Sequence, residues 1–153
     1  MSVRTAYRYF PTKEALIESF NEWVGKQWGS PPLPTSIEEL PAMAAGLLES
    51  FERNEHLVRA GRQSEHGAKL RKLRKVGQVK AMKRVVTTYA PFYDDAAVEK
   101  VVGVLLNLLS SEAWLAMRDN LGLSTPQCIE SVQWGIAAIV AKIDSERPHK
   151  GRK

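Results

Sequence analysis

Residues 98–117, VEKVVGVLLNLLSSEAWLAM, form the stretch that decides the fold class of this chain. As a helix, this stretch is apolar nearly all the way round, and such a helix is buried on several sides. Asp94 or Asp95 is expected to open it, and Gly122 is a natural C-terminal cap. The sequence therefore predicts one buried helix over about residues 95–119.

Amphipathic periodicity predicts further helices on both sides of this stretch. Each has apolar side chains at three- and four-residue steps, which is the spacing of one helical face. No segment predicts a strand, because the β-branched clusters fall within helical periodicity. We therefore expect an all-α fold of about seven helices. The other predicted helices span about residues 2–9, 12–28, 36–51, 54–63, 65–89 and 124–146.

Capping residues and a linker mark the expected boundaries. Ser36 and Glu39 have the spacing of a capping box. Asn54 is expected to cap the next helix, and Ser124 or Thr125 the last one, with Pro126 in its first turn. The sequence GSPPLP at residues 29–34 breaks helices and is the best candidate for a domain boundary.

Composition narrows the class of protein. The chain has 153 residues, 44% of them hydrophobic and 25% charged, which is ordinary for a globular domain. No apolar run reaches the roughly 18 residues that span a bilayer, and no signal peptide is evident. One cysteine, Cys128, and three widely spaced histidines give no disulfide and no metal-ligand spacing. We therefore expect a cytoplasmic protein with no membrane contact, no metal and no cofactor.

The charge distribution is uneven. The net charge is +5, and the helix predicted at 65–89 carries eight Lys and Arg residues between Lys69 and Arg84, with no acid between Glu65 and Asp94. We interpret this as a solvated helix face; a second nucleic-acid surface, or electrostatic support of a DNA-binding domain, is the alternative. Its apolar stripe includes Val76, then Val79 or Ala81, then Met82.

The run SVRTAYRYFPTKEALIESF at residues 2–20 carries a family pattern. Tyr7-Arg8-Tyr9-Phe10 is followed by Pro11-Thr12 and then by Lys13-Glu14-Ala15-Leu16. This pattern resembles the end of the helix-turn-helix of TetR-family transcriptional regulators. The segment from Trp114 through Leu123 to the last helix resembles that family's dimer-forming helix pair more loosely.

The resemblance implies a ligand-responsive regulator, a repressor by preference, that acts as a homodimer. Residues 1–28 are then the remnant of a helix-turn-helix domain, with a recognition helix and a linker helix. Residues 29–153 form the helical effector-binding and dimerisation domain. A recognition helix presents polar groups to DNA while its other side packs inward. The residues expected to contact double-stranded operator DNA are Arg4, Thr5, Tyr7, Arg8, Tyr9 and Lys13.

The family pattern has two further helices ahead of the recognition helix, and Met1 stands where the turn leads into it. A start codon assigned too late, a cut chain and a natural loss each account for this. We therefore expect this polypeptide to bind DNA poorly, and a version with about 30 to 45 upstream residues to bind a palindrome tightly.

The effector is expected in a pocket enclosed by the helices from residue 36 to 119, because the helix at 98–117 has more apolar faces than one core needs. An apolar or aromatic small molecule suits such a pocket. Asn107 lies in an apolar helix, where a buried amide bonds either a ligand or a neighbouring helix. The other candidates, for which a plain core role is the alternative, are Phe51, Met82 and Trp114.

The last helix is the candidate dimer interface. Two consecutive helices with this much apolar surface favour a symmetric four-helix contact, although plain core packing is the alternative. The residues expected to face the partner are Val132, Ile136, Ile139, Val140 and Ile143. A Val132→Glu or Ile139→Glu change is then expected to dissociate the dimer.

No catalytic constellation is present in the sequence, so we do not expect an enzyme. It has no Gly-rich phosphate loop, no nucleophile elbow and no paired carboxylates on a buried face. The main alternative to a regulator is a dimeric small-molecule or protein-binding module without DNA activity, and a helical enzyme is a more distant one.

Overall fold

The computed structural model describes Thr12, residues 29–63 and residues 65–148, without the side chains of residues 63, 65, 66 and 68–74. This part contains six helices and no strand, which confirms the all-α expectation for it. They are α3 (Leu40–Arg53), α4 (Glu55–Gln63), α5 (Glu65–Tyr89), α6 (Asp95–Leu108), α7 (Ser111–Leu121) and α8 (Thr125–Ser145).

The chain divides into two compact units, Met1–Ser30 and Pro31–Lys153, and all six helices belong to the second. The helices predicted at residues 2–9 and 12–28 lie in the first unit. Nearly all of that unit is outside the described residues. The same holds for every candidate DNA contact, which are Arg4, Thr5, Tyr7, Arg8, Tyr9 and Lys13.

The first helix of the second unit begins later than predicted. Its N-cap is Glu39, whose side chain makes no capping bond, and Pro41 lies in its first turn. The Glu39 carboxylate instead accepts from the Thr35 backbone N–H at 2.8 Å and from the Thr35 hydroxyl at 2.9 Å. The predicted Ser36–Glu39 capping box is therefore wrong, because the chain turns before α3 starts and Glu39, not Ser36, is the N-cap of α3.

The long helix predicted at 95–119 is two helices. α6 ends at Leu108, α7 begins at Ser111, and their axes differ by 51°. Ser110 makes the break, because its hydroxyl accepts from the Ala113 N–H at 3.1 Å and so caps α7. The apolar periodicity continues through this point, which is why periodicity alone predicted one helix.

Three other caps agree with the sequence. Asp94 caps α6 by accepting from the Ala97 N–H at 2.8 Å. Ser124 caps α8 in a capping box with Gln127, and Pro126 lies in the first turn. Gly122 ends α7 at a φ of 65°, the left-handed conformation that glycine adopts without strain.

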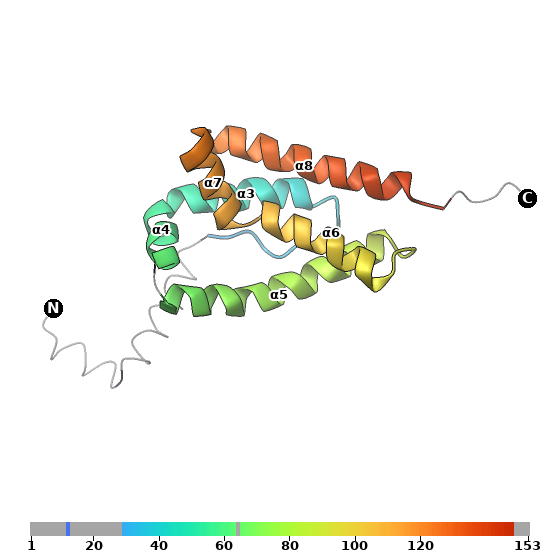
Figure 1. Ribbon diagram of the computed structural model, residues 1–153, viewed down its shortest axis with the longest axis horizontal. Helices are drawn as coiled ribbons and strands as arrows, with labels where there is room; N and C mark the ends of the chain where they lie inside the picture. Colours follow the sequence, from blue (N-terminus) through green and yellow to red (C-terminus); the bar gives the residue numbers. More distant parts are fainter. Residues whose placement is uncertain (1–11, 13–28, 64, 149–153) are drawn as a thin grey trace, which may run out of the picture. The chain divides into compact units, whose positions relative to one another are not determined.

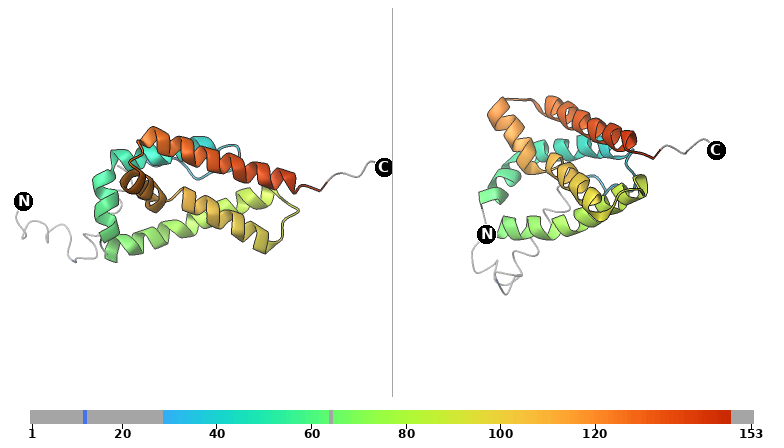
Figure 2. Two further views of the ribbon diagram at one scale, coloured as in Figure 1. Left: turned by 45° about the horizontal axis from the view of Figure 1, so that its top comes forward. Right: turned by 45° about the vertical axis from the view of Figure 1, so that its right-hand side comes forward.

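The helices of this unit pack in pairs. α3 lies along α8, α5 lies along α6, and α4 and α7 meet at one end (Figures 1 and 2). The interior is filled by side chains from α3, α5, α6, α7 and α8. The largest fully buried ones are Trp114, Leu40, Leu48, Leu105, Ile136, Ile143, Val85, Val86 and Val132.

Among the described side chains of α5, the apolar stripe is buried from Ala81 onwards. Ala81 and Met82 are buried and Val79 is half-buried, whereas Val76 is 68% exposed. The stripe therefore runs through Ala81, and the prediction for Val76 was wrong. α6 has 14 residues and is too short to cover the whole of the 25-residue α5.

A close approach of two glycines forms the corner between α4 and α5. Gly67 is buried, and a Cβ atom placed on it would overlap the carbonyl oxygen of Gly61. It would also lie 2.7 Å from the carbonyl carbon and 2.9 Å from the Cα of Gly61. Only glycine at residue 67 leaves room for the α4 backbone, so this pair sets how tightly the chain turns.

Candidate functional site: the core around Trp114 and the outer face of α8

The predicted effector residues fall into two groups. Phe51, Met82 and Trp114 are core side chains, 7%, 2% and 0% exposed, and the Phe51 and Trp114 rings lie 5.8 Å apart between centroids. Asn107 is exposed, so the expectation of a buried amide was wrong. α6 buries the face formed by Val98, Val101, Val102 and Leu105, and Asn107 lies off that face.

Trp114 carries an unusual feature for a core residue. Its indole N–H is buried and has no hydrogen-bond partner in the described part of the chain. The hydroxyl of Thr125, at the start of α8, is also buried and has no hydrogen-bond partner among the described residues. A buried donor without a partner is destabilising by about 1–3 kcal/mol, so each such group calls for an explanation.

Two hollows stand out on the surface of the described residues. One lies between α6 and α8 and the other between α4 and α7, and both are open to solvent. Neither is enclosed as predicted, and none of Phe51, Met82, Asn107 and Trp114 borders either of them.

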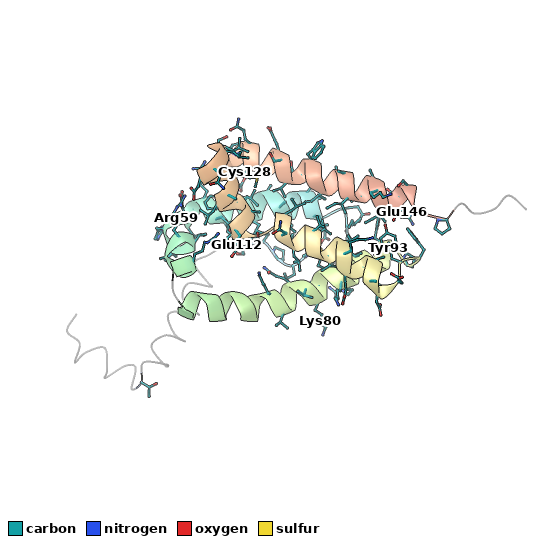
Figure 3. All side chains as sticks on the ribbon, in the orientation of Figure 1. Arg59, Lys80, Tyr93, Glu112, Cys128 and Glu146 are labelled. Atoms are coloured by element: carbon teal, nitrogen blue, oxygen red, sulfur yellow. The ribbon has the colours of Figure 1, made fainter. Side chains whose placement is uncertain are left out.

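The hollow between α4 and α7 is bridged by a polar clamp. Arg59 on α4 donates to both carboxylate oxygens of Asp119 on α7, at 2.9 and 2.7 Å, and to Glu55 at 2.7 Å. The hydrogen bonds from Arg59 lower the pKa of Asp119. Figure 3 shows Arg59 and Glu112 at the same end of the unit. This clamp joins α4 to α7 near the Gly61–Gly67 corner.

The hollow between α6 and α8, which we call the α6–α8 groove, has an apolar floor and a polar rim. Its volume is about 290 Å³, and nearly all of its surface is apolar. The floor is made by Val101, Val104, Ala138, Ile139 and Ile143, and the rim by Tyr93, Lys100, Lys142 and Glu146.

Glu146 organises one end of this groove. It accepts from the Tyr93 hydroxyl at 2.5 Å and pairs with Lys142 at 2.9 Å. The hydrogen bond to Glu146 raises the pKa of Tyr93 to about 12, and the same bond lowers the pKa of Glu146. Tyr93 and Glu146 lie together in Figure 3, at the end of the unit opposite Arg59. These bonds hold the last turn of α8 against the turn that precedes α6.

The predicted dimer residues do not all face outward. Val132, Ile136 and Ile143 are each 1% exposed within a single chain, so they belong to its own core, and their prediction as partner contacts was wrong. Ile139 and Val140 are half-buried and stay candidates. Because α3 packs along α8, the main apolar stripe of α8 is already covered.

A different residue dominates the outer face of α8. Trp134 is 77% exposed, the most exposed large apolar side chain of the described residues, and Val104 on α6 is 48% exposed. Trp134 was not among the residues predicted from the sequence to face a partner. The signal was present, because Trp134 lies two residues from both Val132 and Ile136 and therefore off the buried stripe, where a polar residue is usual.

The other candidate features of the described region are the basic part of α5, the single cysteine and the possible metal ligands. In the basic part of α5, Lys83 pairs with Glu99 of α6 at 2.8 Å, while Lys75, Lys80 and Arg84 are exposed. Cys128 is buried, and burial raises the pKa of its thiol. No group of three or more His, Cys, Asp or Glu in the described ranges is placed to hold a metal ion.

No single helix of the described part is long and apolar enough to cross a membrane; α6 and α7 pass that test only as a pair bent by 51°. Comparison of the chain with protein family models, with curated proteins and with solved structures gives no match.

Proposed function

We propose that this chain is a ligand-responsive transcriptional regulator of the TetR type, and that it acts as a homodimer on double-stranded DNA. The observation that carries the proposal is the sequence pattern from Tyr7 to Leu16, with its aromatic pair, turn and Lys-Glu-x-Leu. The helical unit that follows supports it. That unit ends in a 21-residue helix, α8, whose outer face carries a solvent-exposed tryptophan.

In this proposal the two units have separate tasks. The candidate DNA contacts between Arg4 and Lys13 bind phosphates and base edges, and the helical unit joins two copies. An effector bound to the helical unit shifts the linker helix at residues 12–28 and so changes the separation of the two recognition helices. Half-sites lie about one helical turn of DNA apart, so a change of a few ångströms weakens binding.

The core around Trp114 is the proposed effector site. Its unpartnered indole N–H is a donor for a ligand oxygen or nitrogen, and the adjoining Phe51 ring offers an aromatic surface. An apolar or aromatic molecule with one hydrogen-bond acceptor fits this chemistry. Its binding would require the core to open, since neither surface hollow reaches these residues.

DNA selection tests the central claim. The 153-residue chain, and the same chain extended by any in-frame upstream residues, are each used to select from random duplexes. Binding is followed by fluorescence anisotropy over a range of salt concentrations. We expect the extended chain to select a palindrome and Arg8→Ala to weaken its binding. Lys80→Ala removes an exposed cation from α5 and serves as the charge-matched control.

Two results would count against the proposal. If neither version selects a sequence, the alternative of a binding module without DNA activity takes its place. If Lys80→Ala weakens specific binding as much as Arg8→Ala does, the basic face of α5, and not the Tyr7–Leu16 segment, is the DNA contact.

A further inference from the structure

Four exposed residues form a ridge along the outer face of α8. Glu130, Trp134, Ala138 and Lys142 follow one another at four-residue steps, so they lie in one row on the helix. All four are exposed, and Figures 1 and 2 show α8 at the edge of the helical unit. We call this row the α8 ridge.

Two copies of the α8 ridge that run antiparallel match each other residue by residue. The two end residues, Glu130 and Lys142, have opposite charges. The two inner residues are apolar, one large (Trp134) and one small (Ala138). If two copies of α8 lie antiparallel about a twofold axis at the level of Ile136, Glu130 of each copy faces Lys142 of the other. Trp134 then faces Ala138. A twofold contact requires this reciprocity, in which every pair of facing residues occurs twice.

We propose that a second copy of this chain docks on the α8 ridge in this antiparallel register, with its Trp134 seated in the α6–α8 groove. This inference rests on the proposed homodimer and assigns its register and its central contact. Ala138 belongs both to the ridge and to the groove floor, so the residue opposite the indole also opens into the groove.

The groove suits an indole. Its floor is apolar, its volume of about 290 Å³ exceeds that of one side chain, and Val104 offers a further exposed apolar surface. Burying an aromatic side chain removes about 150–250 Å² from water, and tryptophan is among the commonest central residues of interfaces. The small side chain of Ala138 leaves the entrance open.

The rim supplies the charge match. Lys142 already pairs with Glu146 in its own chain, and Glu130 makes no ion pair in the described part of the chain. In the proposed register the second copy's Glu130 approaches Lys142 from the side opposite Glu146. Each end of the contact then has a lysine between two glutamates. Opposite charges at the rim favour this register over a parallel one, which would place like residues opposite each other.

Charge exchange between two chains tests the register. Glu130→Lys leaves the ridge of one chain with a lysine at each end, and Lys142→Glu leaves the other with a glutamate at each end, so each variant alone repels its own copy. Mixed together, the two variants should form a heterodimer about fivefold preferred over either homodimer. The double variant E130K/K142E should regain the homodimer, although its new carboxylate at position 142 repels Glu146 within the chain. Native mass spectrometry of tagged chains measures all of these species.

Truncation of the tryptophan tests the central contact. Trp134→Ala should weaken the homodimer about 30-fold or more, as for other buried interface tryptophans. Leu121→Ala removes a similarly exposed apolar side chain at the end of α7 and should change the dissociation constant by less than about threefold. Both positions are on the surface, so the helical circular dichroism of the monomer should stay unchanged.

The outcomes separate the two proposals. A wild-type chain that sediments as a monomer at micromolar concentration overturns the homodimer and this register together. A wild-type dimer whose affinity is unaffected by Trp134→Ala, and whose charge variants do not prefer each other, overturns the register and leaves the homodimer standing.

Discussion

Replacing Gly67 by alanine tests how tightly α4 and α5 are joined. The new Cβ would overlap the carbonyl oxygen of Gly61 and lie 2.7 Å from its carbonyl carbon. These are backbone atoms, so they have no rotamer with which to move away. The corner can accept the methyl group only if α4 and α5 separate, which also strains the Arg59–Asp119 clamp that joins α4 to α7.

The magnitude follows from two opposing effects. Forcing a methyl group into a filled space costs about 1–3 kcal/mol, while alanine in place of glycine stabilises a helix by about 1 kcal/mol. Because the overlap is with backbone atoms, the cost lies in the upper part of that range, and we expect Gly67→Ala to lower the free energy of unfolding by about 1–2 kcal/mol. Gly103→Ala on α6 is the matched control, because nothing lies within 4 Å of its added Cβ. It should raise stability by about 0.4–1 kcal/mol.

Urea unfolding followed by helical circular dichroism measures both variants. The protein concentration must be held constant, because the apparent stability of the proposed dimer depends on it. With filled space at Gly67 and open space at Gly103, the same substitution should change stability with opposite signs at the two positions. A Gly67→Ala chain as stable as the wild type, beside a Gly103→Ala chain that gains as expected, would refute the close approach of Gly67 to Gly61.

An indole N–H, a helix cap and a tyrosine hydroxyl each provide a further test of the structure. Trp114→Phe removes the unpartnered N–H and keeps an aromatic ring, so it should lower the free energy of unfolding by under about 1.5 kcal/mol, against about 3–5 kcal/mol for Trp114→Ala. A larger loss for Trp114→Phe in urea unfolding would mean that the N–H is bonded. Ser110→Ala removes the cap of α7 and should cost about 1 kcal/mol in the same assay, and no loss would show that the α6–α7 break does not depend on this hydroxyl. The bond between neutral Tyr93 and Glu146 should stabilise the fold fully below the unfolded phenol pKa of about 10, and this stabilisation should be lost as pH rises through about 12. Tyr93→Phe should therefore flatten the dependence of stability on pH in that window. An unchanged dependence would contradict the bond.

The sequence predicted the helices well where a local signal marks them. Asp94, Ser124 and Gly122 each occupy the cap expected for them, and α5 has the bounds that periodicity gave. Caps act through bonds to the nearest three or four residues, so they can be recognised without knowing the fold. Ser110 is the instructive exception. Its capping signal was present, but the apolar pattern on both sides obscured it.

The sequence could not predict which apolar face would be shared with a partner. Val132, Ile136 and Ile143 form a regular stripe, and periodicity alone does not say whether a stripe meets the same chain or another one. α3 covers that stripe in the tertiary structure, which leaves Trp134 and the α6–α8 groove uncovered. The candidate interface is therefore formed by Trp134 and the α6–α8 groove, which were not predicted from the sequence.

By itself, then, the amino-acid sequence determined that the described part of the chain is helical and where most of its helices begin and end, because those properties depend on neighbours within one or two turns. Only the tertiary structure decided which side chains are buried, that Asn107 and Trp134 face solvent, and that Gly67 must be small. Those properties depend on residues far apart in the chain. Burial of one helical face requires another helix to cover it, and the choice among covering helices is made by the packing of the whole unit.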